Sequence, residues 1–333
     1  MSDRLAPPTL ADVERAAARI AGQAVRTPLL ESPALGEFAG GRVFLKCENL
    51  QRTGSFKFRG AYNALAALPD EVRARGIVAV SSGNHAQGVA EAARLFGVPA
   101  TIVMPADAPA VKRDRTRRSG ARIVDYDRAS EDREAVAARI MAAQGGTLVH
   151  PYNDPAVIAG QGTIGLEIAA DLAAAGVPAD AVLIPCGGGG LSAGIALAIR
   201  AGSPATEVWA VEPQGFDDYG RSLREGRILA NPAAAGSVAD ALLAPSPGPI
   251  GFTLNRVNLA GGFAVSDGEA LAAVAYAFRE LKLVVEPGGA VGLAALLSRR
   301  HQGTRRITVV VLSGGNIDEA MLSRALASTP ASL

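Results

Sequence analysis

Short apolar runs alternate with longer alanine-rich segments along most of the chain. The runs are rich in Val and Ile, as in buried strands, whereas the longer segments repeat their apolar residues at helical spacing. This alternation predicts parallel sheets flanked by helices, with ligands bound beyond the carboxyl ends of the strands. The predicted elements are strand 76–80 with helix 87–96, strand 100–104 with helix 111–119, strand 121–124 with helix 131–143, strand 181–184 with helix 191–200, strand 207–211, helix 271–281 and strand 307–312.

The length and the apolar content allow two folded lobes. The chain has 333 residues, of which 49% are apolar, enough to bury one large core or two smaller ones. Lysine and arginine number 33 against 32 aspartate and glutamate residues. Because these charges balance, no overall field attracts polyanions, and we expect neither nucleic acid nor an anionic membrane surface as a partner.

The cysteines and the N-terminus indicate a reducing, cytoplasmic setting. Cys47 and Cys186 are the two cysteines of the chain, and neither lies in a closely spaced ligand pattern, which argues against a disulfide framework and a structural zinc site. Residues 1–11 lack the apolar core and cleavage site of a signal peptide. We also expect no apolar run long enough to span a bilayer.

The strongest local signal is the glycine run, Gly187 to Gly190, which lies between a predicted strand and a predicted helix. Without side chains, its backbone N–H groups can converge on a phosphate, and the N-terminus of the following helix adds a favourable partial charge. The spacing matches neither the dinucleotide fingerprint nor the phosphate loop that ends in Lys-Ser/Thr. The run therefore favours a monophosphate, with a flexible turn as the alternative.

A lysine flanked by two aromatic residues is a candidate nucleophile. Lys57 lies between Phe56 and Phe58 in the sequence Ser-Phe-Lys-Phe-Arg-Gly. This setting could desolvate the amine, lower its pKa and let it attack an aldehyde. The alternative is a surface lysine whose apolar stem packs on its neighbours.

Two further polar turns follow predicted strands, where parallel sheets bind ligands. Residues 81–85, Ser-Ser-Gly-Asn-His, open a helix. Free N–H groups there can bind a carboxylate, although hydroxyl and amide side chains also serve as ordinary helix caps. Residues 312–316, Leu-Ser-Gly-Gly-Asn, follow the last strand and form, taken alone, an ordinary glycine turn.

Together the four segments resemble, in order and in wording, the fold type II family of pyridoxal phosphate (PLP) enzymes, and within it the serine/threonine dehydratase and serine racemase branch. The resemblance covers residues 27–318. It implies an α/β fold of two lobes, each a mostly parallel sheet flanked by helices, with the cofactor in the cleft between them. The expected lobes are a large PLP-binding domain of residues 1–66 and 152–333 and a small domain of residues 67–151.

The resemblance implies roles for the residues around the cofactor. Lys57 would carry PLP as a Schiff base and later remove the substrate Cα proton, with Phe56 packed beside the ring. Asn84 would hydrogen-bond the phenolic oxygen, and Ser313 would face the pyridine nitrogen. A hydroxyl keeps that nitrogen less protonated than a carboxylate does, which favours β-elimination over transamination. The phosphate would be held by Gly187, Gly188, Gly189, Gly190 and the N–H of Leu191.

The resemblance also implies substrate contacts. Ser81, Ser82 and His85 would bind the substrate carboxylate, and Ser82 matches the opposite-face acid/base of serine racemases. Arg133 falls where serine racemase-like members place an arginine near the substrate, with a solvated helix residue as the alternative. A basic residue there would suit a second carboxylate, which brings hydroxyaspartate into the list of substrates.

Residues 212–218, Glu-Pro-Gln-Gly-Phe-Asp-Asp, resemble the segment in which this branch binds a divalent cation. Glu212, the carbonyl of Phe216 and Asp218 would be the ligands. Carboxylate and carbonyl oxygens suit a hard ion such as Mg²⁺ or Ca²⁺. The alternative is a set of acidic loop residues that are simply solvated.

The chain departs from the family in one loop near the cofactor. Ala241 stands where the family usually has glycine, so a methyl group could narrow or reshape the substrate pocket. The chain ends soon after Ser313, and we therefore expect no C-terminal regulatory domain and no feedback inhibition by a downstream amino acid.

These observations predict a cytoplasmic PLP-dependent ammonia-lyase, expected as a homodimer, that converts a small β-hydroxy amino acid such as L-serine or L-threonine into a 2-oxo acid and ammonia. The alternatives are a serine racemase, a hydroxyaspartate or phenylserine dehydratase, a β-replacement enzyme such as cysteine synthase, and a non-catalytic binding protein. Lys57 disfavours the last of these. The sequence leaves open which β-hydroxy amino acid is preferred.

Overall fold

The computed structural model describes residues 6–108, 110–127, 130–233, 235–301 and 306–328, which form two β-sheets. The strands are β1 (Leu29–Glu31), β2 (Arg42–Cys47), β3 (Ile77–Val80), β4 (Ala100–Pro105), β5 (Arg122–Tyr126), β6 (Thr147–Leu148), β7 (Ala181–Pro185), β8 (Glu207–Pro213), β9 (Gly261–Val265) and β10 (Ile307–Leu312). The larger sheet has the order β1-β2-β10-β7-β8-β9, and the smaller has the order β5-β4-β3-β6. Among these strands only β1 and β2 pair antiparallel. The predicted α/β fold with mostly parallel sheets is confirmed.

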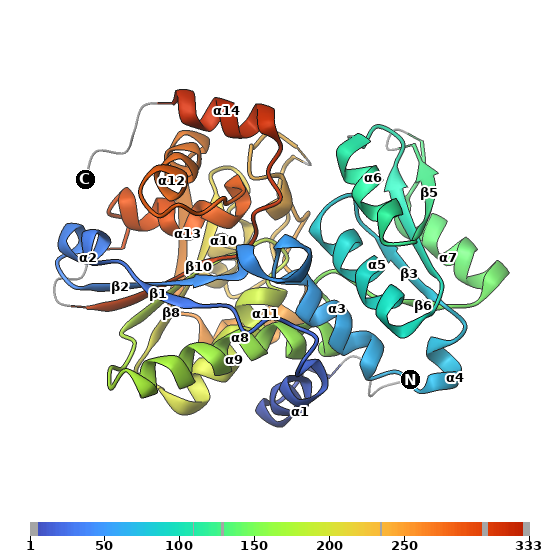
Figure 1. The fold of residues 1–333 in the computed structure, drawn as a ribbon, viewed down its shortest axis with the longest axis horizontal. Helices are drawn as coiled ribbons and strands as arrows, with labels where there is room; N and C mark the ends of the chain where they lie inside the picture. Colours follow the sequence, from blue (N-terminus) through green and yellow to red (C-terminus); the bar gives the residue numbers. More distant parts are fainter. Residues whose placement is uncertain (1–5, 109, 128–129, 234, 302–305, 329–333) are drawn as a thin grey trace.

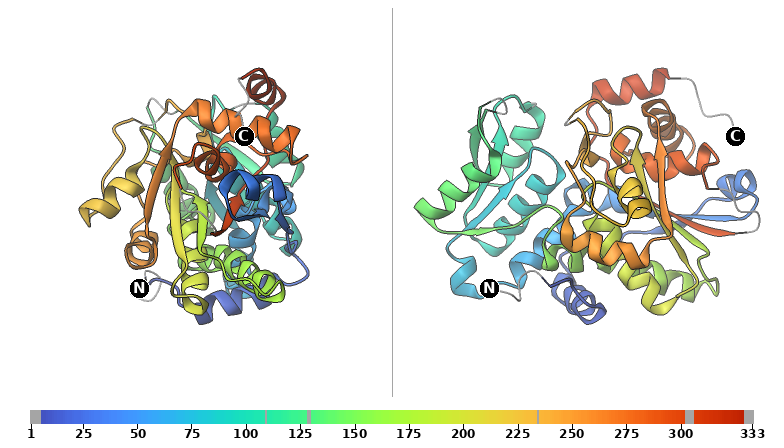
Figure 2. Two further views of the ribbon diagram at one scale, coloured as in Figure 1. Left: turned by 90° about the vertical axis from the view of Figure 1, so that its left-hand side faces the viewer. Right: turned by 180° about the vertical axis from the view of Figure 1, so that it is seen from behind.

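Helices flank both sheets, as Figures 1 and 2 show. They are α1 (Leu10–Ile20), α2 (Pro33–Ala39), α3 (Lys57–Ala66), α4 (Asp70–Arg73), α5 (Asn84–Phe96), α6 (Ala110–Arg118), α7 (Arg133–Gln144), α8 (Pro155–Ala174), α9 (Gly190–Gly202), α10 (Asp218–Glu225), α11 (Pro249–Asn258), α12 (Asp267–Arg279), α13 (Pro287–Leu297) and α14 (Glu319–Ala327). Successive residues of a strand face opposite sides of the sheet. Accordingly, Val182 and Ile184 belong to the core cluster of α8 and α9, whereas Leu183 belongs to that of α12 and α13.

Helix α3 lies between the two sheets. In Figure 1 the four-stranded sheet and helices α4 to α7 lie on the right, the six-stranded sheet lies on the left, and α3 runs between them. Phe58 and Leu65 of α3 belong to the same core cluster as Ile77 and Ile102 of the smaller sheet. The first residue of α3 is Lys57, so the candidate nucleophile stands where the two parts of the molecule meet.

Every predicted helix and strand is present, with ends shifted by a few residues. The predicted helix 87–96 begins earlier, at Asn84, and the predicted helix 271–281 begins at Asp267. Both extensions add first-turn residues that an apolar pattern does not mark. Strands β1, β2, β6 and β9 were not predicted. β1 and β6 are too short, with three and two residues, to display a period.

Helix α8 corrects the expectation that no apolar run could span a bilayer. It has 20 residues, and an 18-residue window within it has a mean hydropathy of 1.2, so by length and composition it could cross a membrane. In the structure 61% of this stretch is buried inside the protein, where the helix packs along α1, α3 and α9. Asp154 caps its first turn, and Pro155 occupies the first position. The apolar surface of α8 is thus used in the protein core.

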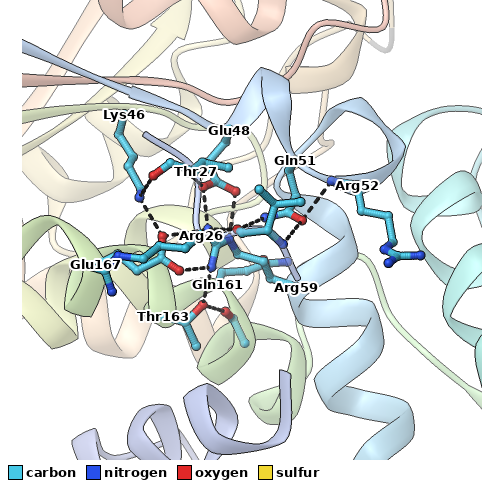
Figure 3. A network of polar contacts seen from close by, with 12 residues as sticks. Arg26, Thr27, Lys46, Glu48, Gln51, Arg52, Arg59, Gln161, Thr163 and Glu167 are labelled. Carbon is cyan, nitrogen blue, oxygen red and sulfur yellow. Dashed lines mark hydrogen bonds and ion pairs between the residues drawn. The ribbon is translucent and has the colours of Figure 1, made fainter. Parts of the chain in front are cut away.

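A buried network of charges ties α3 to α8 and to the segment that precedes α3 (Figure 3). Arg59 has no exposed surface, and its guanidinium donates to Glu48 over 2.8 Å and to Glu167 of α8 over 2.7 Å. Lys46, also fully buried, pairs with the same Glu167 over 2.6 Å. The helices approach so closely at this level that a Cβ on Gly160 would lie 2.6 Å from the Cα of Gly60.

This network determines where Lys57 lies, because Arg59 is two residues further along the same helix. Removing two charges from water costs several kcal/mol per ion, and only good geometry and further hydrogen bonds offset that cost. Arg59 meets this condition through additional bonds to Thr163 and to the carbonyl of Val25. A shift of α3 along its axis would break these bonds together.

We expect Arg59→Met to lower the free energy of unfolding by about 3–5 kcal/mol, the usual result of removing one partner from a buried ion pair. Methionine fills similar space but leaves Glu48 buried without its cation. Chemical denaturation measures the change. The matched control is Arg15→Met, since Arg15 pairs with Asp12 at the surface and its removal should cost at most about 1 kcal/mol. Similar losses in both variants would contradict the role given to Arg59.

Candidate active site

The backbone before Lys57 is held against the loop that follows β10. Ser55 forms an isolated bridge with Gly314, and the N–H of Phe56 donates to the carbonyl of Ser313 over 3.1 Å. Ser313 itself is 4% exposed. Two candidate segments that lie more than 250 positions apart in the sequence are thus in contact in the structure.

The amine of Lys57 is desolvated. Its Nζ donates to the carbonyl of Pro151 over 2.7 Å and lies 5.1 Å from the centre of the Phe56 ring. Burial lowers the pKa of Lys57 to about 8, and the charge of Glu286 opposes part of this effect. About half of the amine is therefore neutral at pH 8, available as a nucleophile or a base.

Two histidines near Lys57 are neutral at ordinary pH. Burial, followed by the charge of Lys57, lowers the pKa of His85 to about 3. The same two causes lower the pKa of His150 to about 4. Of these three groups only Lys57 changes its protonation near neutral pH, so it is the natural acid/base of the set.

The glycine run presents unpaired backbone donors at the start of α9. Within the described ranges, no group accepts a hydrogen bond from the N–H groups of residues 187–191. Gly189 has a φ of 86°, which glycine adopts without strain. A Cβ on Gly188 would overlap the ring of Tyr152, and one on Gly189 would overlap Tyr219. Free N–H groups at a helix N-terminus suit a phosphate, so the residues present fit the cofactor that the sequence implied.

Asn84, the first residue of α5, is held from both sides. Its Nδ2 donates to Glu286 over 2.6 Å, and its Oδ1 accepts from Nδ2 of Asn316 over 2.8 Å. The amide is therefore fixed in one orientation beside the glycine turn that follows β10. Glu286 was not predicted from the sequence, although an acidic residue before Pro287 at a helix start was a visible signal.

The polar turn before α5 offers hydroxyls and backbone donors. Ser81 and Ser82 are half-buried, and Ser81 Oγ accepts the N–H of Gly83 over 3.1 Å. The ring of His85 donates from Nε2 to the carbonyl of Val149 over 2.8 Å. A carboxylate bound here would meet N–H groups and hydroxyls, because the ring of His85 is neutral and bonded elsewhere.

Residues 150–153 were not singled out from the sequence, yet they touch both Lys57 and the glycine run. The carbonyl of Pro151 accepts from Lys57, and the ring of Tyr152 covers Gly188. His150 stands edge-on to Tyr152, with ring centres 4.6 Å apart. A signal was present, since this polar segment follows β6 at the carboxyl end of a parallel strand.

Arg133 lies within electrostatic reach of this segment. It is the first residue of α7, and its side chain is exposed. Its charge is a third cause, after burial and Lys57, of the lowered pKa of His150. It also opposes the rise that burial causes in the pKa of Tyr152. Arg133 is thus both a solvated helix residue and a cation near the site.

Glu212 and Asp218 form a buried acidic pair at the end of β8 and the start of α10. Neither has exposed surface. The carboxylate of Glu212 accepts the N–H groups of Tyr219 and Gly220, each over 2.8 Å. Asp218 Oδ1 accepts from Asn231 over 2.6 Å, whereas its Oδ2 is buried and has no partner among the described residues.

The acidic pair has the electrostatics of a cation site. Burial raises the pKa of Asp218 to about 6. Burial, and then the charge of Asp218, raises the pKa of Glu212 well above its ordinary value. No group of three or more His, Cys, Asp or Glu side chains suited to a metal occurs in the described part of the chain. The possible metal ligands here are thus the carboxylates of Glu212 and Asp218 and the backbone carbonyl of Phe216.

Ala241 borders the site without entering the core. It lies in a short 3₁₀ helix, Asp240–Leu242, and is exposed. A Cβ on Gly288 would lie 3.2 Å from that of Ala241, and a Cβ on Gly187 would lie 3.1 Å from the Cα of Leu242. The turn therefore lies between the start of α13 and the glycine run.

Comparisons with known proteins agree with this geometry. A model of the family described as pyridoxal-phosphate dependent enzyme matches residues 20–314. An L-threo-3-hydroxyaspartate ammonia-lyase from Pseudomonas sp is 45% identical over 307 residues, which cover 92% of this chain and 95% of that protein. Two solved structures are also similar. A threonine deaminase from T.th. is 46% identical with a TM-score of 0.89, covering 93% of this chain and 99% of that one. Maize serine racemase is 36% identical with a TM-score of 0.90, covering 96% and 97%.

The desolvated lysine, the unpaired donors of the glycine run and the family match over most of the chain lead to one assignment. This chain belongs to the fold type II family of PLP-dependent enzymes.

Proposed function

We propose that this enzyme eliminates water from a small β-hydroxy amino acid, such as L-serine or L-threonine, and releases a 2-oxo acid and ammonia. The observation that carries the proposal is the setting of Lys57. Its amine has a pKa of about 8 and donates to Pro151 in the segment that covers the glycine run. The backbone just before it, at Phe56, bonds to the carbonyl of Ser313. The names of the similar hydroxyaspartate ammonia-lyase and threonine deaminase support an elimination.

The residues around the cofactor would have separate roles in proton transfer, phosphate binding and placement of the ring. Bound PLP supplies the electron sink that allows the substrate Cα to lose a proton. The neutral amine of Lys57 would take that proton, and the N–H groups of residues 187–191 would hold the phosphate. Phe56 would pack beside the cofactor ring, Asn84 would bond to its phenolic oxygen, and Ser313 would face its pyridine nitrogen.

The turn before α5 holds the substrate. The hydroxyls of Ser81 and Ser82 and the N–H of His85 bind its α-carboxylate, aided by the partial positive charge of the helix N-terminus. If Ser82 also gives a proton to the face opposite Lys57, the enzyme racemises serine. The similarity to maize serine racemase supports this side activity, which chiral analysis of recovered substrate detects.

A second candidate substrate is 3-hydroxyaspartate. The charge of Arg133 reaches His150 and Tyr152 beside Lys57, so a β-carboxylate near these rings would meet a cation. The similar Pseudomonas protein is named for this substrate. Phenylserine, whose side chain carries no charge, would gain nothing from Arg133.

We also propose that the acidic pair binds Mg²⁺ or Ca²⁺. Glu212, the carbonyl of Phe216 and Asp218 would be its ligands. The support is the unpartnered Oδ2 of Asp218 and the raised pKa of Glu212, which is caused first by burial and then by repulsion from Asp218. A hard cation would neutralise both carboxylates and accept the free oxygen as a ligand.

The assembly we propose is a cytoplasmic homodimer, each chain with a large domain of residues 1–66 and 152–333 and a small domain of residues 67–151. All strands of the smaller sheet fall within 67–151.

Two exposed apolar side chains suggest where the second copy binds, since Leu50 and Val284 are 48% and 43% exposed. Asn49 joins their segments by donating to the Val284 carbonyl, so a second copy could cover both side chains. Light scattering would test for twice the chain mass of 33.9 kDa.

The pKa of Lys57 predicts how cofactor capture depends on pH. Only the neutral amine attacks an aldehyde, so the rate at which cofactor-free protein captures PLP should rise with pH and level off above about 8. Absorbance of the lysine-bound cofactor measures this rate. Lys57→Ala should show no capture and no turnover. A rate that still rises steeply above pH 10, as for an ordinary lysine, would contradict the desolvated setting.

Arg133→Ala should lower kcat/KM for 3-hydroxyaspartate by at least about tenfold, because a charge-assisted contact contributes ~1.5–3 kcal/mol. The panel is L-serine, L-threonine, phenylserine and 3-hydroxyaspartate, scored for release of oxo acid and ammonia, and the monocarboxylic substrates should change little. The control is Arg139→Ala, since Arg139 lies on the same helix and pairs with Glu131 at the surface.

Each other outcome of this panel has a definite meaning. A similar loss for every substrate would assign Arg133 to the common α-carboxylate. A wild-type profile would make it a solvated residue and remove the reason for preferring a dicarboxylic substrate. If no member of the panel releases ammonia, the elimination itself is wrong.

Asp218→Asn tests the cation site. Millimolar Mg²⁺ or Ca²⁺ should raise the melting temperature of the wild-type protein by ~2–5 °C, because an ion that binds only the folded state stabilises it. The variant should lose this shift. Asp217→Asn is the control, since Asp217 is next to Asp218 in the sequence but forms an ion pair with Arg221. An equal shift in both variants, or none in the wild type, would sink the cation site.

A further inference from the structure

Buried polar side chains support the glycine run from behind. Tyr219 and Asn255 have no exposed surface, and Asn255 Nδ2 donates to the hydroxyl of Tyr219 over 2.9 Å. The same Nδ2 lies 3.2 Å from the carbonyl oxygen of Gly189 and 3.0 Å from Oγ of Ser192. Ser192 Oγ donates to that carbonyl over 3.1 Å. The Gly189 carbonyl thus receives side-chain hydrogen bonds in addition to the backbone N–H of Ala193.

These contacts set the direction of a backbone donor. In a planar trans peptide the carbonyl and the N–H point in opposite directions. Holding the Gly189 oxygen from behind therefore turns the N–H of Gly190 toward the opposite side, where no described group accepts it. Gly189, with a φ of 86° and no Cβ, has little local restraint on its peptide plane. The side chains behind it add restraint to that supplied by the N–H of Ala193.

The ring of Tyr219 is itself held firmly. Its hydroxyl and ring occupy the space into which a Cβ on Gly189 would point. Its backbone N–H donates to Glu212 over 2.8 Å, and its ring packs against Phe252 with centres 6.2 Å apart. The surrounding cluster, which includes Cys186, is apolar. In such surroundings a hydrogen bond is strong, and a lost partner is costly.

We propose that Tyr219 and Asn255 are positioning residues for the phosphate of the cofactor. Neither touches the phosphate; both act through the peptide between Gly189 and Gly190, whose N–H they aim. The proposal rests on the proposed assignment of residues 187–191 to the phosphate. It predicts that the two side chains matter for ligands that carry a phosphate and not for ligands that lack one.

The experiment compares PLP with pyridoxal, which has the same aldehyde and no phosphate. Full-length protein freed of cofactor is titrated with each, and absorbance of the lysine-bound form reports binding. Tyr219→Phe should raise the Kd for PLP about threefold to tenfold, the effect of one hydrogen bond, and leave that for pyridoxal within about twofold. Asn255→Leu should have a larger effect of the same selectivity, because it removes the bond to Gly189 directly.

Tyr276→Phe is the matched control. The hydroxyl of Tyr276 is buried and has no partner among the described residues, so the same atom is removed from a similar environment without loss of a hydrogen bond. Its PLP and pyridoxal affinities should both equal those of the wild type. If Asn255→Leu fails to fold, the milder Tyr219→Phe decides the question.

The outcomes distinguish a failure of the positioning role of Tyr219 and Asn255 from a failure of the assignment of residues 187–191 to the phosphate. If Tyr219→Phe weakens PLP and pyridoxal equally, the residue only maintains the fold, and the positioning role is wrong. Unchanged PLP affinity in Tyr219→Phe would overturn the role as well. If the wild-type protein binds PLP no more tightly than pyridoxal, the glycine run does not hold the phosphate, and the site assignment itself falls.

Discussion

A fully buried guanidinium requires matching carboxylates, and the match found by Arg59 organises the whole site. Glu48 lies before the segment that leads to Lys57, and Glu167 lies on α8. An ion without a partner in the protein interior costs several kcal/mol. Other registers of α3 against α8 would break the Arg59 ion pairs and are therefore disfavoured. Lys57, two residues from Arg59, is thereby placed so that its amine donates to the carbonyl of Pro151, in the segment just before α8.

On this rigid frame the site is built mainly from backbone groups. The glycine run and the turn before α5 both place free N–H groups at helix starts, where the helix dipole favours anions. Side-chain charge is sparse by comparison, since burial keeps His85 and His150 neutral. Lys57 is therefore the one of these three groups that changes its protonation near neutral pH.

The acidic pair and the glycine run share a structural element. Glu212 accepts the backbone N–H of Tyr219, while the side chain of Tyr219 lies behind Gly189 and binds Asn255. The first turn of α10 therefore touches the proposed cation ligands with its backbone and the proposed phosphate support with its side chain. Helix α10 thus contributes to both the proposed cation site and the support of the glycine run.

The sequence by itself predicted the alternating fold, six of the ten strands of the two sheets, and the lysine and glycine run on which the proposed site is built. These signals are local, because a strand period or a helix-start donor set is complete within a few positions. Helix α8 was missed because a helix buried on most sides lacks a polar face to reveal its period. The partners of the site were decided by the tertiary structure. Glu286 meets Asn84 across 202 positions, and Asn255 meets Gly189 across 66. Such contacts depend on how sheets and helices pack, which no short stretch of sequence encodes.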